Sequence, residues 1–358
     1  MITILPSRLK LLHFPRSQLP HVTHAIVKAC FFQDIKDPEY FFSFTENAYE
    51  ISIAANQAII DHDILPFLHA TPSHDIGTSP DIFRVMQVDD ADGQDASGKR
   101  ISDLSEPLAQ AKFSIFYMST YQTDFVLVRE RRLRQSVQTL MDHGFEFDQD
   151  SLDMLQNESA ALSNMIRHSN ASTESLGSAV DSAASSLHAP DDHQDGESTE
   201  STVLTNELRC AGLNPHYRST WAMTLLKILS FPEMIEGYSA EQSRFVSYTA
   251  TSEGISVLAD KHILDLFEEE SIFQDEDSVP MRVIQVNLGG SNLDRCGIVR
   301  SISHPLAGEH INLWYLSTYK TANIIVSADD IERAEEILRP DLEKMREMLD
   351  DVVLEPLQ

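Results

Sequence analysis

Apolar residues recur along the chain with two different periods, and these periods predict alternating strands and helices. The β-branched run at 83–88 is typical of a strand. After a polar loop, the apolar residues of 101–108 are spaced three and four apart, which is the period of a helix. Two adjoining runs, 113–120 and 124–128, predict a strand pair, and the apolar stripe of 131–143 predicts a closing helix. The predicted order is strand, helix, strand, strand, helix.

The same order returns 198 residues later, where RVMQV at 84–88 is matched by RVIQV at 282–286. The second copy predicts a strand pair at 311–318 and 322–326, followed by a closing helix at 328–349. Because an internal duplication decides the architecture, the chain is predicted to consist of two similar halves.

A weaker repeat precedes each strong copy, since FFSFT at 41–45 is matched by FVSYT at 245–249, 204 residues later. The fold class we expect is α+β, with four small modules of the ferredoxin-like βαββαβ order. The last strand of a module would come from neighbouring sequence, such as FEF at 145–147. The expected boundaries are 1–78 for module 1, 79–148 for module 2, 204–278 for module 3 and 279–352 for module 4.

Residues 149–203 join the two halves and differ from both in composition. Their central part is rich in Ser, Asp and Glu and has no aromatic residue. Such a segment cannot bury enough apolar surface to offset an ordering cost of about 1–2 kcal/mol per residue. We predict a disordered acidic linker over 149–203.

Three prolines fall inside predicted helices. Pro107 and Pro305 occupy the same place in the two halves, and Pro340 lies within the last helix. Because proline lacks the N–H group that a helix uses, we expect a kink or restart at the first two and a break at Pro340.

The chain is acidic, with 27 Lys and Arg against 56 Asp and Glu and a net charge of −29. Such a charge repels phosphate backbones and anionic lipid surfaces, so neither nucleic acid nor a membrane is an expected partner. The three cysteines, Cys30, Cys210 and Cys296, are far apart and odd in number, which is typical of a reducing compartment. The sequence also shows no signal peptide and no apolar span of about 20 residues. We expect a cytoplasmic protein.

Motifs of catalysis and metal binding are absent from the sequence. It contains no G-x-S-x-G, P-loop, H-E-x-x-H or C-x-x-C pattern. The acidic stretch at 89–95 lacks the glycine and the final acid of a calcium loop and is interpreted as a solvated loop. We therefore expect no enzyme activity, no catalytic residues, no metal and no cofactor.

The loop GGSNLDRCGIV at 289–299 is the strongest candidate site. Gly297 can adopt backbone angles that other residues avoid, and it lies where a predicted strand passes to a helix. The free N–H groups of a helix start favour a carboxylate. Lys99 occupies the matching position of the first half. The residues leave two readings open, a small-anion or amino-acid site and a tight turn without a ligand.

Two motifs resemble a known family. The pattern C-G-I-V-x-x-I-x-x-P-L-A at 296–307, followed by I-N-L and a strand pair, resembles the ACT domain. ACT domains are small regulatory βαββαβ modules that often bind amino acids where two modules meet. The phrase STYQTDFVLVRE at 119–130 is similar to the CASTOR-type cytosolic arginine sensors of the TOR kinase pathway. The resemblance covers most of the chain and implies a non-enzymatic, amino-acid-binding regulatory protein in nutrient sensing.

The resemblance implies a ligand between modules 2 and 4. The hydroxyl and backbone of Ser114 would bind the ligand's carboxylate and amine from one side. The loop around Gly297 would contact the same two groups from the other side. The implied ligand-binding residues are Phe113, Ser114, Ile115, Arg295, Cys296, Gly297, Ile298, Val299, Thr318, Tyr319, Thr321 and Ala322.

The resemblance also implies partners. Tyr121, Gln122 and Asp124 match residues that contact GATOR-type complexes in the ligand-free sensors. It further implies a homodimer formed through modules 1 and 3.

Two positions depart from the sensors, which carry acids where this chain has Arg295 and Ala322. An unpaired buried guanidinium would cost several kcal/mol, which argues against arginine as the ligand. Two alternatives to an amino-acid sensor stay open: an interaction module with a vestigial pocket, and the regulatory subunit of an amino-acid biosynthetic enzyme.

Overall fold

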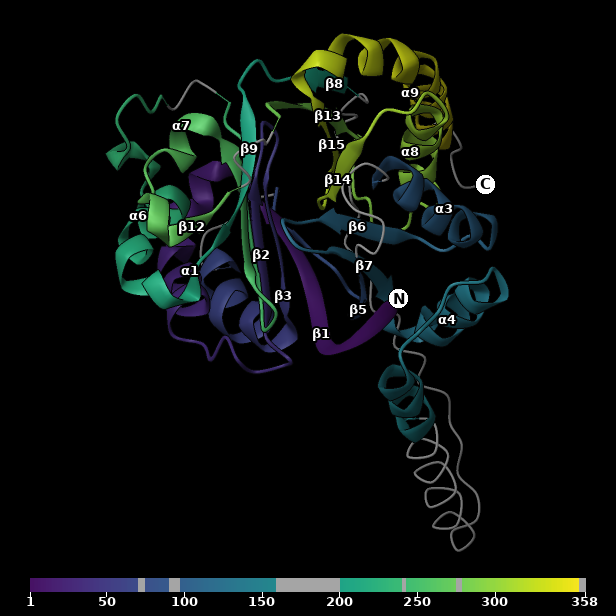
Figure 1. The fold of residues 1–358 in the computed structure, drawn as a ribbon, viewed down its shortest axis with the longest axis horizontal. Coiled ribbons are helices and arrows are strands. Elements are labelled where there is room, and N and C mark those ends of the chain that lie inside the picture. The colour runs from purple at the N-terminus through teal and green to yellow at the C-terminus, as the bar shows by residue number, and fades with distance from the viewer. Residues whose placement is uncertain (70–74, 90–96, 159–199, 240–242, 275–278, 354–358) are drawn as a thin grey trace, which may run out of the picture.

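A computed structural model describes residues 1–69, 75–89, 97–158, 200–239, 243–274 and 279–353 (Figure 1). The described elements follow the order strand, helix, strand, strand, helix in four successive units. Unit 1 holds β1 (Ile2–Phe14), α1 (Leu19–Phe31), β2 (Phe41–Glu46), β3 (Ile51–Asn56), a π-helical segment (Ile59–Ile64) and α2 (Leu65–His69). Unit 2 holds β5 (Phe83–Val88), α3 (Ser97–Gln110), β6 (Ile115–Ser119), β7 (Asp124–Arg129) and α4 (Leu133–Asp142).

The second half repeats this order. Unit 3 holds β9 (Leu208–Leu213), α6 (Arg218–Ser230), β10 (Val246–Thr251), β11 (Ile255–Asp260) and α7 (Lys261–Leu264). Unit 4 holds β13 (Met281–Asn287), α8 (Ile298–Gly308), β14 (Leu313–Ser317), β15 (Thr321–Ser327) and α9 (Ile331–Val353). Short strands β4 (Gly77–Thr78), β8 (Glu200–Val203) and β12 (Ile272–Phe273) lie at the margins.

Within the described residues, the four units share one 15-stranded sheet and pair across the two halves of the chain. Units 1 and 3 join through antiparallel β2 and β10, and units 2 and 4 join through β6 and β14. β1 links the two pairs by pairing with β5, and β9 pairs with β13 at Leu208 and Met281. The path from β9 round to β13 therefore closes on itself.

Helices cover the outer faces of both pairs of units, as Figure 1 shows. One outer core lies under α1 and α6, and a second lies under α3 and α8. A third core fills the inside of the closed sheet and draws on all four units. β6 illustrates the alternation, because Ile115 and Tyr117 face the outer core while Phe116 and Met118 face the inner one. Strands buried on both faces explain the continuous apolar runs of the sequence.

The predicted strands and helices of the strong repeats are confirmed. The strand pair expected at 113–120 and 124–128 is β6 with β7, and the stripe at 131–143 is α4. The extra strand expected at 145–147 is reduced to a single parallel bridge between Phe147 and Ile2. The mixed helix and strand architecture agrees with the expected α+β class.

The break predicted at Pro340 is wrong, because α9 continues to Val353. Pro340 lies on the exposed side of that helix, so water can bond the carbonyl group that proline leaves free. The helices α3 and α8 likewise contain Pro107 and Pro305 without restarting.

The disorder predicted for 149–203 does not hold at the two ends of that segment, which form secondary structure. Residues 149–158 are helical, with Leu155 buried and the Ser151 hydroxyl accepting the Ile4 N–H at 2.6 Å. At the other end β8 pairs with β13 along four residues. Composition misses these ends because their few apolar side chains are buried against distant strands. Residues 159–199 lie outside the described residues.

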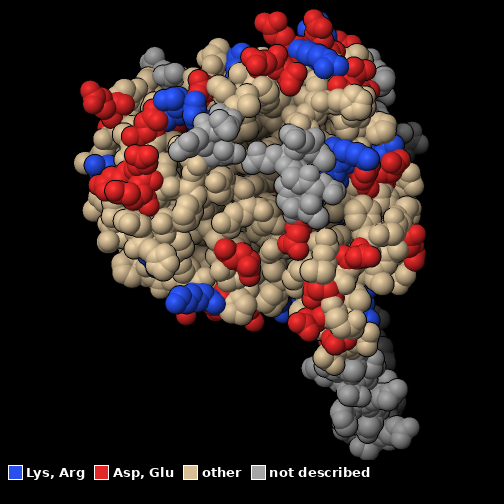
Figure 2. All heavy atoms as spheres, viewed as in Figure 1, with Lys and Arg blue, Asp and Glu red and all other residues tan. Residues whose placement is uncertain are grey.

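Acidic side chains are spread over the face seen in Figure 2, in keeping with the net charge of −29. Among the described residues, no helix is long and apolar enough to cross a membrane.

Candidate functional site

The two Ser-Thr-Tyr motifs join units 2 and 4. The N–H of Tyr117 donates to the Ser317 hydroxyl at 3.0 Å, and the N–H of Tyr315 donates to the Ser119 hydroxyl at 3.2 Å. These bonds are reciprocal, since Tyr315 is the equivalent of Tyr117 and Ser317 is the equivalent of Ser119, each 198 residues later. The duplicated motif therefore gives the unit 2 and unit 4 contact an approximate two-fold symmetry.

The tyrosine of each motif also contacts the other pair of units. The N–H of Tyr319 donates to Ser52 of unit 1 at 3.1 Å, and the N–H of Tyr121 donates to Ser256 of unit 3 at 2.9 Å. Ser52 and Ser256 are themselves equivalent in the weaker repeat. Each motif thus ties one outer pair of units to the other.

The loop that precedes α8 is held against unit 2. The Ser114 hydroxyl donates to the Leu293 carbonyl at 2.7 Å, and the Arg129 guanidinium donates to the same carbonyl at 2.8 Å. Gly297 is the N-cap of α8 with a φ of 83°, a conformation that favours glycine. A Cβ at Gly297 would lie 3.9 Å from the Ala109 Cβ, so the start of α8 lies beside α3. The structure therefore brings Ser114 and this loop together.

The other predicted ligand-binding residues near this loop differ in their exposure to solvent. Arg295 is half-buried and donates to the Leu288 carbonyl of its own loop, and burial lowers the pKa of its guanidinium. Cys296 is exposed and Ile298 is half-buried. The side chains of Phe113 and Ile115 in unit 2 and of Val299 in unit 4 are buried.

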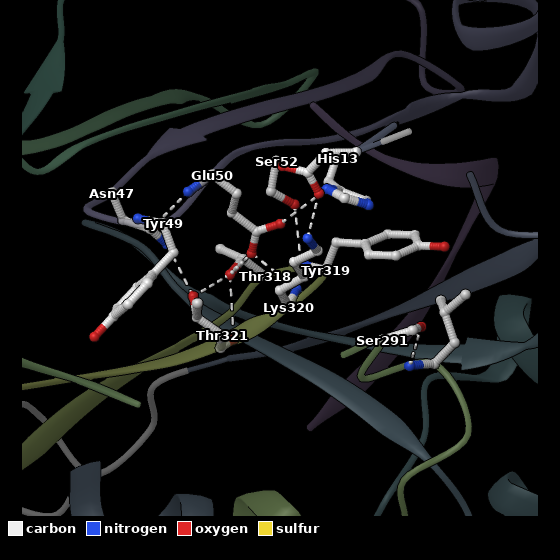
Figure 3. Close-up of polar contacts among 12 residues, drawn as sticks. His13, Asn47, Tyr49, Glu50, Ser52, Ser291, Thr318, Tyr319, Lys320 and Thr321 are labelled. Carbon is white, nitrogen blue, oxygen red and sulfur yellow. Dashed lines mark hydrogen bonds and ion pairs between the residues drawn. The ribbon is translucent and has the colours of Figure 1, made fainter. Parts of the chain in front are cut away.

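The side chains expected at the far end of the ligand separate into two groups. Ala322 is fully buried in the core under α3 and α8. Thr318, Tyr319 and Thr321 instead contact unit 1, as Figure 3 shows. The structure does not gather these four residues around one point.

In unit 1, the buried carboxyl group of Glu50 lies at the centre of this contact. Oε1 of Glu50 accepts the Thr318 hydroxyl at 2.7 Å and the Lys320 N–H at 2.8 Å. Asn47 donates to the Thr321 hydroxyl at 2.8 Å (Figure 3). Burial raises the pKa of Glu50 to about 7, although both donors oppose the shift.

His13 of β1 lies beside this carboxyl group (Figure 3). Its Nδ1 is 3.8 Å from Oε2 of Glu50, and its ring centroid is 4.4 Å from that of Tyr319. Burial, followed by the charge of Lys320, lowers the pKa of His13 to about 4. Glu50 could not be predicted from the sequence, because an isolated acid beside a strand is not recognisable as special until the fold buries it.

The predicted partner residues also differ in accessibility. Gln122 is exposed and Tyr121 is half-buried, whereas Asp124 is 3% exposed. The Asp124 carboxylate accepts the Tyr117 hydroxyl at 2.8 Å and two Arg100 N–H groups at 2.9 and 2.8 Å. In this conformation its carboxylate bonds within unit 2.

Unit 4 lacks this triad. The equivalents of Asp124 and Arg100 are Ala322 and Ile298. The equivalent of Tyr117 is Tyr315, whose buried hydroxyl has no hydrogen-bond partner in the described part of the chain. The difference between the two motifs therefore accounts for a buried tyrosine hydroxyl without a partner in unit 4.

Comparisons with known proteins agree with the repeated units. An ACT domain model matches residues 78–142 and 278–340, which correspond to units 2 and 4. The human protein "Cytosolic arginine sensor for mTORC1 subunit 1" is 24% identical over 349 residues, covering 94% of this chain and 96% of the relative. Its counterpart from Mus musculus is 26% identical over 348 residues, with the same coverage of both chains.

Solved structures similar to this chain include an aspartate kinase from Synechocystis, with 10% identity, 96% of this chain covered, 56% of the kinase covered and a TM-score of 0.32. The regulatory subunit of aspartate kinase from Thermus thermophilus is 9% identical, with 39% of this chain and 95% of the subunit covered and a TM-score of 0.27. Each half therefore contains a match to the ACT domain, and the chain is similar to CASTOR-type arginine sensors over nearly its whole length.

Proposed function

We propose that this protein is a non-enzymatic regulator that binds an amino acid between units 2 and 4. Its curated relatives are named as cytosolic arginine sensors, which supports an amino-acid-sensing role in TOR signalling and a cytoplasmic location. The observation that carries the proposal is the bond from Ser114 of unit 2 to Leu293 of unit 4, in the loop that leads to Gly297 at the start of α8.

Units 1 and 3 are proposed to be ACT modules as well, which gives four modules in the chain. Both have the element order of units 2 and 4, although the ACT domain model does not extend to them. The proposed boundaries remain 1–78, 79–148, 204–278 and 279–352, with the linker between the second and third modules.

The chemistry of the proposed site suits an α-amino acid. The first N–H groups of α8 have no partner within the helix and favour the ligand's carboxylate. The Ser114 hydroxyl donates to Leu293, so its lone pairs remain available to an ammonium group. The buried Tyr315 hydroxyl would donate to an acceptor on the ligand's side chain.

We propose a ligand without a cationic side chain. Ala322 offers only a methyl group, and Arg295 brings a positive charge to the loop. A guanidinium placed here would be buried without an acid to pair with it, at a cost of several kcal/mol. Arginine is therefore not the ligand we favour.

Thermal-shift measurements with each of the twenty amino acids test this proposal. A ligand at about 100 times its Kd stabilises the folded state by about 2.7 kcal/mol, which raises Tm by several degrees. Ser114→Trp should abolish the shift, whereas Asn312→Trp, at the exposed equivalent position of unit 4, should retain it. A flat response to every amino acid would sink the sensor hypothesis.

A GATOR-type complex is the partner we propose, with Tyr121 and Gln122 as accessible contacts. Asp124 could join them only if its bonds to Arg100 and Tyr117 opened. Pull-downs with Gln122→Ala test this contact, and Lys320→Ala at the equivalent position of unit 4 is the control. Equal capture by both variants would exclude Gln122 from the interface.

The second candidate function is partner binding without a ligand. It is favoured by the Ser114 to Leu293 bond, which already closes the loop against unit 2. In that case Gln122→Ala would lose the partner while no amino acid changed the capture of the wild-type protein.

A homodimer through units 1 and 3 is also proposed. Phe32 after α1, Met223 on α6 and Met234 after α6 are 77%, 60% and 65% exposed. Large apolar side chains exposed on paired units are typical of an interface. Light scattering should give a dimer for the wild type and a monomer for Met223→Asp, and a wild-type monomer would contradict the proposal.

A further inference from the structure

Unit 3 contains a cavity with buried charges, and none of the residues that line it belongs to the loop at Gly297. Its volume is about 50 Å³, enough for several water molecules or a very small organic ligand. Arg244 and Asp260, 5% and 1% exposed, form its floor. Its lining also includes the exposed residues Gly237, Ser243 and His262.

Each of the two floor residues keeps one polar atom without a partner in the described part of the chain. Arg244 donates Nε and Nη2 to Glu46 and also Nη2 to the Ile228 carbonyl, but its buried Nη1 donates to no acceptor. Asp260 accepts the Asn206 amide at 3.0 Å through Oδ2, while its buried Oδ1 accepts nothing. Buried charged atoms rarely stay unpaired, so each of these two atoms requires a partner.

The net charge of the cluster restricts what that partner can be. Glu46 is paired with both Arg16 and Arg244, and Asp260 supplies a second negative charge. Two arginines and two carboxylates sum to zero. A lone anion or a lone cation in the cavity would leave an uncompensated buried charge, whereas a zwitterion would not.

We propose that this cavity is a second binding site, for a small zwitterionic amino acid of the size of glycine, alanine or serine. Its carboxylate accepts from Nη1 of Arg244, and its ammonium donates to Oδ1 of Asp260. The small volume excludes long side chains. Burial raises the pKa of Asp260 to about 6, so the carboxylate is largely ionised at pH 7.5.

Such a ligand would also strengthen the contact between units 1 and 3, because Arg244 of unit 3 holds Glu46 of unit 1. A group fixed to Nη1 immobilises the guanidinium that makes this bond. This site does not rest on the function proposed for units 2 and 4 and involves none of its residues.

Calorimetric titration of the full-length protein with glycine, L-alanine, L-serine and glycine betaine at pH 7.5 tests the proposal. At least one of the first three should bind, and Asp260→Asn should weaken its binding tenfold or more. Asp265→Asn, an exposed acid paired with Lys261, is the matched control and should bind as the wild type does. Glycine betaine has no N–H group for Asp260 and should bind at least tenfold more weakly than glycine.

Ser243→Trp provides a second test if Asp260→Asn fails to fold, because it adds bulk to the lining and leaves both buried charges in place. It should abolish binding, and Ser114→Trp should leave binding unchanged. The proposal is overturned if none of the three amino acids binds, if betaine binds as well as glycine, if neither cavity variant weakens binding, or if Ser114→Trp abolishes it.

Discussion

Glu50 and His13 are neighbours whose pKa values move in opposite directions for the same reason. Burial disfavours the charged form of each, so the pKa of Glu50 rises from 4.5 to about 7 and that of His13 falls from 6.5 to about 4. The contact between units 1 and 4 is therefore most stable when both groups are neutral.

Glu50→Gln should change how stability depends on pH. Folded Glu50 binds its proton more tightly than the unfolded chain does, so its contribution is complete below pH 4.5 and is lost as the pH rises through 7. Glutamine stays neutral and keeps an oxygen for Thr318 and Lys320. The free energy of unfolding of the variant, relative to wild type, should rise by about 3 kcal/mol between pH 4.5 and pH 8.

Urea unfolding at several pH values measures this difference. His13 acts in the opposite sense, because its lowered pKa means that stability is lost as the pH falls from 6.5 towards 4. Below pH 6.5, the free energy of unfolding of Glu50→Gln should therefore fall with pH because of His13, without the opposing contribution of Glu50. A difference between variant and wild type that does not vary with pH would contradict the burial argument.

Ala322 explains why the two Ser-Thr-Tyr motifs are not interchangeable. Ala322→Asp would bury a carboxylate beside the Tyr315 hydroxyl but without the arginine that Asp124 has, and should cost about 3 kcal/mol or more. Adding Ile298→Arg would rebuild the triad of unit 2 and should recover part of that loss. Chemical denaturation of both single variants and the double variant gives the coupling energy, and additive losses would show that the triad is not transferable.

At the scale of elements, the turn between β6 and β7 and the turn between β14 and β15 each bind one serine hydroxyl of the other pair of units. Ser52 and Ser256 each accept one tyrosine N–H from the opposite pair. The two contacts differ in their surroundings, because Gly254 faces Gln122 where unit 1 places Glu50.

Ser52→Ala and Ser256→Ala form a matched pair. Each change leaves a tyrosine N–H without its acceptor and should lower the free energy of unfolding by about 1–3 kcal/mol. The loss should be larger for Ser52→Ala, because Tyr319 is buried whereas Tyr121 is half-buried and closer to water. Urea denaturation measures both, and equal stability of the variants and the wild type would show that water replaces these bonds.

At the scale of the whole molecule, neither half of the chain is complete alone. Unit 1 pairs with unit 3 and unit 2 with unit 4, and the inner core takes residues from all four units. Residues 1–158 alone would expose the edges of β2 and β6 together with half of that core.

Separate expression of 1–158 and 200–353 tests this interdependence. Each half alone should self-associate or aggregate, because its unpaired strand edges and apolar surface are exposed. Mixing or coexpression should give a single species that contains the two halves in equal numbers. Size-exclusion chromatography with light scattering measures the mass, and two well-behaved monomeric halves would contradict the closed arrangement.

Much of the fold was predictable from local patterns, whereas the site was only partly so. Alternating periods located β6, β7 and α4, and the position of Gly297 predicted a special backbone turn that the structure confirms. The helix break predicted at Pro340 was wrong, because a missing N–H disrupts a helix less when the carbonyl group that it leaves unbonded faces water. The disorder predicted at the ends of the linker was wrong because composition does not show which distant strand a short apolar stretch will meet.

The sequence by itself determined the duplication, the element order and the similarity of the two Ser-Thr-Tyr motifs, because these depend on residues close together or on direct repetition. Only the tertiary structure decided that the tyrosines contact the other pair of units, that Glu50 and Asp124 are buried, and that Arg244 and Asp260 share a cavity. Burial and charge pairing join residues far apart in the chain, and the properties of such residues depend on what the fold places around them.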